Sequence, residues 1–431
     1  MNEKQKITQS IKQNAEQNAE QNAKEIEQKN KKTLWVVTEL YYPEETSTGY
    51  YLTRIAEGLA DDYEVKVLCG QPNYSAKGTR APKRETHKQV EIFRSFGTTL
   101  DKNIILFRLI NMLTLSLSIF WNALFQFRKG NQVLVVTTPP SLPFVTALAS
   151  LARGTNYILL IHDNYPEILI AARKSSPESI FVKTLDYCNR WLYKYASKII
   201  VVGRDMKKLV ERKTEGLDIP VITIPNWAEL ETVFPAERDT NELLQELNLQ
   251  SKYVFLYAGN MGYPNDLESI IWCAGQLRNE LPVHFIFLGS GVKRNWLERE
   301  VKEKDLTNVT VLAPRPRSEQ TIFLNACDVA VVSLVKKMWG VSMPSRTYNI
   351  LAAGKPILAL TEDTSELAQV VEEENIGWVV TPDAPQELLD TIREIYSVKN
   401  SLFEMRNRAR RSAVEKYSLK AALEQYKKAM R

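Results

Sequence analysis

The stretch Gly340-Val-Ser-Met-Pro-Ser-Arg-Thr-Tyr-Asn-Ile-Leu-Ala-Ala-Gly-Lys-Pro-Ile357 decides how the rest of this sequence is interpreted. Ser345 follows a proline, and its hydroxyl is suited to cap a helix that begins at the next residue. Gly354 suits the left-handed position that ends a helix, and Pro356 prevents continuation. The apolar run 357–360 then predicts a strand. The stretch therefore predicts a short capped helix that leads directly into a buried strand.

The amino end of this predicted helix is suited to bind an anion. Ser345, Arg346 and Thr347 place two hydroxyls and a guanidinium beside free backbone amides and the positive end of the helix dipole. A guanidinium also matches the geometry of phosphate oxygens. We predict a diphosphate site at this end, and a helix capped only for packing is the alternative.

These residues also carry a family resemblance. The segment Met343-Pro-Ser-Arg-Thr-Tyr-Asn-Ile-Leu-Ala-Ala-Gly-Lys-Pro356 resembles the donor-site helix of family 4 glycosyltransferases, in a fucosamine-transferase-like branch that builds bacterial surface glycans. The resemblance covers about 33–431. It implies the GT-B fold, an α/β architecture of two doubly wound parallel-sheet, Rossmann-like domains that face a cleft. It also implies a retaining, metal-independent hexosyltransferase that moves a sugar from a nucleotide-sugar donor to a glycan or lipid-linked glycan acceptor, without a cofactor.

Composition is that of a soluble globular protein with two domains. The chain has 431 residues, 44% hydrophobic and 25% charged. Its net charge of +5 is small for this length, so we expect no nucleic-acid partner. The four cysteines contain no Cys-x-x-Cys pair and suggest buried thiols in a reducing cytoplasm. The N-terminus has no apolar signal core, so we expect a cytoplasmic protein.

The order of segments predicts the domain boundaries. Residues 1–32 are polar and repeat Asn-Ala-Glu-Gln, which predicts a disordered or loosely helical tail. Strand and helix patterns alternate from residue 33 onward, as in parallel sheets wrapped by helices. We predict a first, acceptor-side domain over 33–228 and a second, nucleotide-sugar-binding domain over 229–412. By the resemblance, a final helix over 413–431 crosses back to the first domain.

The segment 104–127 is the most apolar part of the chain. It is about long enough to cross a bilayer, yet Arg108, Asn111 and Asn122 interrupt it and a core strand follows. Three hypotheses remain open: a helix packed on the sheet, a helix partly embedded in the membrane face, and a transmembrane span. The second would place the protein at the inner face of the plasma membrane and would suit a lipid-linked acceptor.

The segment His162-Asp-Asn-Tyr-Pro-Glu167 follows a predicted strand of the first domain. Residues just beyond the carboxyl ends of strands face the ligand crevice in doubly wound sheets. The segment resembles the family's His-Asp-x-x-Pro-Glu motif, which implies that His162 and Asp163 are catalytic and that Glu167 lies on the sugar side. A hydrogen-bonded core histidine is the alternative.

The loop at 42–49 resembles the loop that follows the first strand in family 4 enzymes. That loop usually carries a glycine pair beside the acceptor and the donor sugar, and here Gly49 remains with Thr48 before it. An ordinary helix N-cap, with a helix from about 50 to 61, is the alternative. The basic, loop-rich residues 70–103 are interpreted either as an acceptor-facing zone or as a solvated loop.

The second domain carries candidate donor-binding residues after several predicted strands. Glycines there let a backbone approach a nucleotide closely. With Ser345, Arg346 and Thr347, the candidates are Gly259, Asn260, Gly262, Gly289, Gly291, Arg317 and Asn349. Neither glycine pair completes a dinucleotide fingerprint, so a dehydrogenase is a weak interpretation.

This chain departs from the family pattern at two places, so neutralisation of the donor phosphates is expected to fall mainly on Arg346. Many members carry an arginine and a lysine where this chain has Asn260 and Asn265, and two glutamates where it has Val341 and Asn349. Asn349 can still hydrogen-bond a ribose hydroxyl. Help with the phosphate charge is expected from Arg317, Lys336 or Lys337. A nucleotide-sugar epimerase of the same fold and a non-catalytic glycan-assembly partner remain as alternatives.

Overall fold

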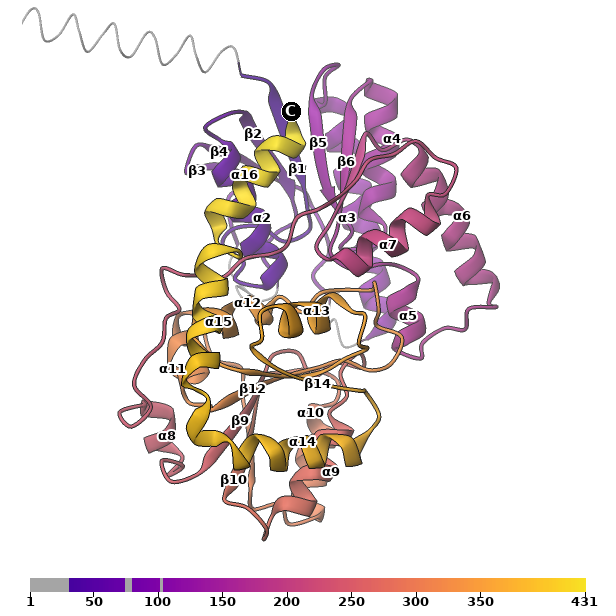
Figure 1. Ribbon diagram of the computed structural model, residues 1–431. Coiled ribbons are helices and arrows are strands. Elements are labelled where there is room, and N and C mark those ends of the chain that lie inside the picture. The colour runs from indigo at the N-terminus through magenta and orange to yellow at the C-terminus, as the bar shows by residue number, and fades with distance from the viewer. Residues whose placement is uncertain (1–30, 74–79, 101–103) are drawn as a thin grey trace, which may run out of the picture. The chain divides into compact units, whose positions relative to one another are not determined.

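Figure 1 shows the computed structural model, which describes residues 31–73, 80–100 and 104–431. The predicted tail 1–32 lies almost wholly outside these described residues. The described residues form two compact units. One contains those up to 135 together with 145–157, and the other contains 136–144 together with 158–431.

The first sheet has eight strands in the order β3-β4-β2-β1-β5-β6-β7-β8. The pairs β1–β2, β1–β5, β2–β4, β6–β7 and β7–β8 are parallel, and β3 runs antiparallel to β4. The strands are β1 Thr33–Val37, β2 Glu64–Cys69, β3 Arg84–His87, β4 Val90–Arg94, β5 Gln132–Val136, β6 Asn156–Ile161, β7 Lys198–Val201 and β8 Val221–Thr223.

The second sheet has six parallel strands in the order β11-β10-β9-β12-β13-β14. The chain moves outward from β9 in one direction and then from β12 in the other, so the strand order reverses between β9 and β12. Ligands bind at the carboxyl ends of the strands at such a switch point. The strands are β9 Tyr253–Ala258, β10 Val283–Leu288, β11 Val309–Leu312, β12 Val329–Ser333, β13 Ile357–Leu360 and β14 Gly377–Val380.

Helices cover both faces of the second sheet. In Figure 1, α12 and α13 lie on one side of its strands and α9 and α14 on the other. The predicted fold class, two doubly wound parallel sheets, is confirmed. The helices are α2 Ser47–Leu59, α3 Ile105–Gln126, α4 Leu142–Arg153, α5 Glu167–Ala171, α6 Ile180–Lys194, α7 Arg204–Lys213, α8 Glu242–Glu246, α9 Glu268–Leu277, α10 Arg294–Glu303, α11 Gln320–Asn325, α12 Arg346–Ala352, α13 Glu366–Glu373, α14 Pro385–Ser397, α15 Phe403–Glu415 and α16 Leu419–Met430.

The predicted loop-rich segment 70–103 contains two strands, β3 and β4. β3 pairs with β4 through a tight hairpin in which Lys88 and Gln89 adopt positive φ angles of 44° and 65°. Such turns favour glycine or asparagine. Neither occurs at these two positions, so this hairpin could not be predicted from its turn residues. The Arg84 Nε donates to the Glu91 carboxylate across the two strands at 2.7 Å.

Helix α3 corresponds to the apolar segment 104–127. Leu115, Ile119 and Ala123 are buried, which agrees with the hypothesis of a helix packed on the sheet. In the described part of the chain, α3 is also the one helix long and apolar enough to cross a membrane, and only 22% of its apolar window is buried. Packing therefore accounts for one face of α3 and leaves the other unexplained.

Candidate active site

Arg346 lies at the switch point of the second sheet. It is the first residue of α12, and its Nη1 donates to the carbonyl of Ala258, the last residue of β9, at 3.4 Å. Its Nη2 donates to Asn265 Oδ1 at 3.0 Å, and its Cζ lies 4.5 Å from the centre of the Tyr257 ring. The fold thus holds a half-buried guanidinium where a doubly wound sheet binds its ligand.

Glycines in the adjoining loops permit this arrangement. Gly259, Gly289 and Gly291 have φ angles of 150°, 149° and 146°. A Cβ at Gly259 would overlap Arg346 Nη1, and one at Gly289 would overlap the Gly259 carbonyl. These glycines therefore allow the loops after β9 and β10 to approach each other and Arg346. The sequence suggested a different use for them, contact with a nucleotide, and that contact stays a prediction.

We expect Gly259→Ala to weaken donor binding because the new methyl group would displace the Arg346 side chain. The expected result is a rise of about tenfold in the donor Kd, equivalent to ~1.4 kcal/mol, measured by calorimetry. Gly275→Ala is the matched control, since a Cβ there would meet its nearest neighbour at an ordinary 3.7 Å. Equal donor affinity in the two variants would refute the role of Gly259.

The predicted carboxyl end of α12 is confirmed, whereas the predicted cap at its amino end is wrong. Gly354 has φ +63° and its amide donates to the Leu351 carbonyl, as expected for the helix end. The predicted Ser345 side-chain cap is wrong: within the described structure its side chain makes no capping bond. Ser345 already has helical angles, φ −62° and ψ −25°, so its hydroxyl cannot reach the following amides. The turn instead begins with the Thr347 amide bonded to the Pro344 carbonyl.

A polar cluster surrounds Asn349. Its Nδ2 donates to Glu229 Oε1 at 2.5 Å and to Gln320 Oε1 at 2.6 Å, and its Oδ1 accepts from the Glu229 amide at 2.9 Å. Arg317 donates two hydrogen bonds to the carboxylate of Glu229, from Nε at 2.9 Å and from Nη2 at 2.5 Å. Both amide protons of Asn349 are therefore engaged within the protein. Thr347 on the same helix is fully buried.

His162 and Asp163 follow β6, in a segment that hydrogen-bonds with the segment before α12. Asp163 forms an antiparallel bridge with Ser342, and the Asn164 amide donates to the Val341 carbonyl at 2.8 Å. The Asn164 Nδ2 also donates to the Gly340 carbonyl at 2.6 Å. Two motifs that are more than 170 positions apart in sequence are thus adjacent.

Burial sets the charge of both residues. It lowers the pKa of His162 to about 4, so the imidazole is neutral at pH 7. Burial raises the pKa of Asp163 to about 6, partly offset by a hydrogen bond with Ser342. No described residue hydrogen-bonds the buried Nε2 of His162. The pair therefore combines a neutral imidazole with a carboxyl that titrates near physiological pH.

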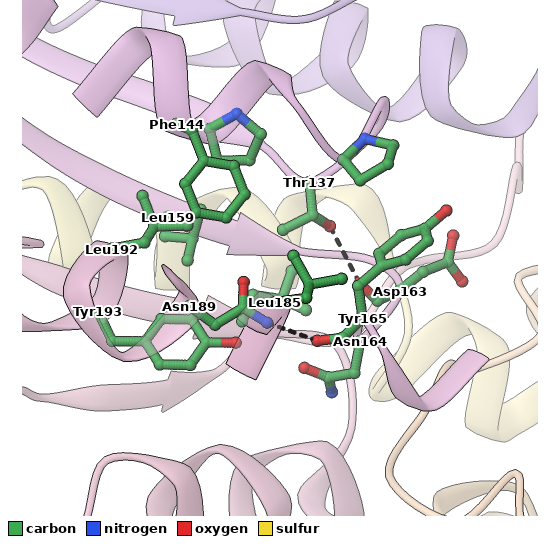
Figure 2. Close-up of a pocket in the computed structure, with 13 residues that line it drawn as sticks. Thr137, Phe144, Leu159, Asp163, Asn164, Tyr165, Leu185, Asn189, Leu192 and Tyr193 are labelled. Atoms are coloured by element: carbon green, nitrogen blue, oxygen red, sulfur yellow. Dashed lines mark hydrogen bonds between the residues drawn. The ribbon is translucent and has the colours of Figure 1, made fainter. Parts of the chain in front are cut away.

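Figure 2 shows the small cavity beside Asp163. Its volume is about 20 Å³, room for roughly one water molecule. Thr137 Oγ1 donates to the Asp163 carbonyl and Asn189 Nδ2 to the Tyr165 carbonyl at its edge. A cavity of this size cannot take a sugar, so it belongs to the packing behind the His162 segment.

Two family models match this chain. A glycosyl transferase 4-like domain matches residues 47–227, and the glycosyl transferases group 1 model matches 239–415. The chain belongs to these glycosyltransferases. A probable glycosyltransferase of Pseudomonas aeruginosa, WbjE, is 32% identical over 62% of this chain and 66% of its own length, just under two thirds. A putative colanic acid biosynthesis glycosyl transferase of Escherichia coli, WcaI, is 27% identical over 82% of this chain and 89% of its own length.

Solved structures identify the fold of the glycosyltransferase as GT-B. Sucrose-phosphate synthase from Thermosynechococcus elongatus has a TM-score of 0.75 at 15% identity and covers 93% of this chain and 98% of its own. Anabaena Alr3699/HepE, in complex with UDP, has a TM-score of 0.68 at 16% identity and covers 93% of this chain and 99% of its own.

The remaining predicted site residues of the glycosyltransferase lie in a helix turn, in an ion pair or on the loops of the second sheet. Thr48 and Gly49 lie in the first turn of α2, where the Gly49 amide donates to the Thr46 side chain at 3.3 Å. Glu167 pairs with Lys213 at 2.7 Å. Gly262 is buried, whereas Asn260, Lys336 and Lys337 are exposed.

Two residues of this glycosyltransferase could not be predicted from the sequence pattern. The sequence marks Asn265 only as a lost charge, yet its side chain orients Arg346. Glu229 was not singled out, although it anchors both Arg317 and Asn349 and is only 8% exposed. Its position as the first residue after the predicted domain boundary at 228 was the available signal.

Proposed function

We propose that this glycosyltransferase moves a sugar from a nucleotide-sugar donor to a lipid-linked glycan acceptor in polysaccharide biosynthesis, with retention of configuration. The observation that carries the proposal is the Arg346 guanidinium at the β9–β12 switch point. UDP in the similar Anabaena protein supports the donor class. The name of WcaI, a putative colanic acid biosynthesis glycosyl transferase, supports the pathway.

Arg346 would stabilise the leaving group. Cleavage of the bond between sugar and phosphate builds negative charge on the departing diphosphate, and a fixed cation at that point lowers the barrier. Arg317 contributes little in this proposal because Glu229 already neutralises it. Catalysis without a metal is part of the proposal: Arg346 supplies the positive charge at the diphosphate.

His162 and Asp163 would act on the sugar or the acceptor. The buried Nε2 of neutral His162 can exchange a hydrogen bond with a substrate hydroxyl. Asp163, ionised above about pH 6, can accept a proton or orient a hydroxyl. Substitution of His162 by alanine should therefore lower turnover more than donor affinity.

We expect turnover to fall as the pH drops below about 6, because Asp163 then becomes protonated. Burial raises the pKa of this carboxyl above its ordinary 3.8, so its contribution to stability is present at low pH and is lost as the pH rises through about 6. Protonation of Asp163 itself therefore does not unfold the protein. Asp163→Asn should lower kcat about a hundredfold and abolish this limb of the pH profile. Thermal unfolding over the same pH range is the control, and an unchanged profile in the variant would contradict the role.

One experiment separates the proposal from its alternatives. Nucleotide sugars would be screened for protection against thermal unfolding, and each protecting donor incubated with and without a lipid-linked acceptor and with chelator. Transfer that needs the acceptor and survives chelation is expected. Conversion without acceptor would indicate an epimerase, an intact donor under all conditions would indicate a binding protein, and loss of activity with chelator would exclude the metal-free mechanism.

The proposal also sets the location. A lipid-linked acceptor and a nucleotide sugar meet at the cytoplasmic face of the plasma membrane, so we place the enzyme there, in peripheral contact through 104–127.

A further inference from the structure

Helix α3 has the reverse of the usual polarity of a surface helix. Its two asparagines bond to the protein: Asn111 Oδ1 accepts from the Leu100 amide at 3.0 Å, and Asn122 Nδ2 donates to Ser95 Oγ at 3.1 Å. Two of the three residues that interrupt the apolar run in sequence are thus satisfied by the protein and do not break the outward face. The third, Arg108, is exposed near the start of the helix.

The outward face of α3 is apolar along the whole helix. Large side chains recur on it at spacings of three and four residues, which keeps them on one side of a helix. Trp121 is 56% and Phe125 72% exposed, and their rings stack. We name these residues the α3 face: Leu106, Leu109, Leu113, Leu117, Trp121 and Phe125. Exposed apolar patches of this extent mark interaction sites.

Helix α4 adds to the α3 face at its carboxyl end. Arg153, the last residue of α4, donates through Nε to the carbonyl of Phe127, directly after α3, at 3.1 Å. The carboxyl ends of the two helices are therefore neighbours. Leu148 and Leu151, in the last turns of α4, are exposed as well.

The charged residues of α3, α4 and the segment between them are all basic. No acidic residue occurs between Asp101 and Asp163 in the sequence. The exposed charged side chains at the carboxyl ends of α3 and α4 are Arg128, Lys129 and Arg153. A second copy of this chain would bring two such basic clusters together, whereas an anionic lipid surface would neutralise them.

We propose that the α3 face, with Leu148 and Leu151, docks into the interface of an anionic lipid bilayer. The helix lies in the membrane plane, its apolar side chains among the acyl chains, and Arg128, Lys129 and Arg153 contact lipid phosphates. The inward bonds of Asn111 and Asn122 keep α3 on the protein and exclude a span. This inference deepens the proposed function, on which it rests, by naming the lipid chemistry that this contact selects.

Vesicle sedimentation tests the proposal with the full chain. Vesicles of phosphatidylcholine, with or without phosphatidylglycerol, are mixed with wild type, Trp121→Ser/Phe125→Ser and Arg128→Gln/Lys129→Gln. We expect wild type to bind phosphatidylglycerol vesicles more than tenfold better than neutral ones. Each double variant should lose at least tenfold of that affinity. Phe403→Ser/Val414→Ser, which removes two exposed apolar side chains from α15, is the matched control and should bind as wild type does.

Three outcomes would overturn the proposal: equal binding to both vesicle types, equal binding by the α3 variants and the α15 control, or a concentration-dependent dimer without vesicle binding that Trp121→Ser/Phe125→Ser abolishes. Transfer from a protecting nucleotide sugar to a lipid-linked acceptor is measured in parallel. Wild type that binds vesicles but transfers no sugar would refute the proposed function and leave this inference intact.

Discussion

Replacement of Arg346 by alanine should lower kcat/KM for sugar transfer by about a hundredfold to a thousandfold, as for removal of one donor from a charge-stabilising site. The guanidinium is held by Ala258 and Asn265 at the switch point of the second sheet, so its loss removes a preorganised cation. Donor affinity should fall with turnover, because the same group contacts the diphosphate before and during bond cleavage. Steady-state kinetics and calorimetry with the protecting nucleotide sugar measure both.

A control separates charge from stability in that experiment. Arg278→Ala removes a guanidinium from the carboxyl end of α9, where it donates to the Lys304 and Asp305 carbonyls, and should leave kinetics unchanged. Arg346→Lys keeps the positive charge but loses the planar, two-pronged set of guanidinium donors, so an intermediate activity is expected. Wild-type kinetics for Arg346→Ala would refute the donor-site assignment, as would a donor complex with its diphosphate far from this residue.

The second large effect is expected on stability. Glu229→Ala should lower the free energy of unfolding by about 3–5 kcal/mol, because it leaves a mostly buried guanidinium without its counter-charge. Arg317 and Glu229 side chains are only 16% and 7% exposed, and Asn349 would lose a partner as well. Denaturant unfolding measures the change.

A double replacement tests the cause of that loss. Glu229→Leu combined with Arg317→Met removes both charges and should recover much of the stability, since apolar pairs often replace buried ion pairs without cost. Glu372→Ala, which removes an exposed carboxylate in α13, should change the free energy by no more than ~0.5 kcal/mol. A double variant as unstable as the sum of its parts would show that the ion pair is not the reason.

The core of the candidate site could be predicted because its signals are local. Gly354, Pro356 and the apolar run after them fix the end of α12 and the start of β13 through backbone geometry alone. Arg346 could be selected because it opens that helix. In contrast, the Ser345 cap was wrong, since the preceding Pro344 already starts the turn, and a pattern of residue types does not reveal backbone angles.

The alternation of strands and helices, and hence two doubly wound sheets, could be predicted from the amino-acid pattern alone, because burial on both faces requires apolar strands at regular spacing. The partners that those elements bring together could be seen only in the folded chain. Asn349 meets Glu229 across 120 positions, and Asn164 meets Gly340 across 176. The fold also turns Asn111 and Asn122 of α3 toward the protein. Periodicity could not predict this, since it places residues on faces without saying which face meets the protein.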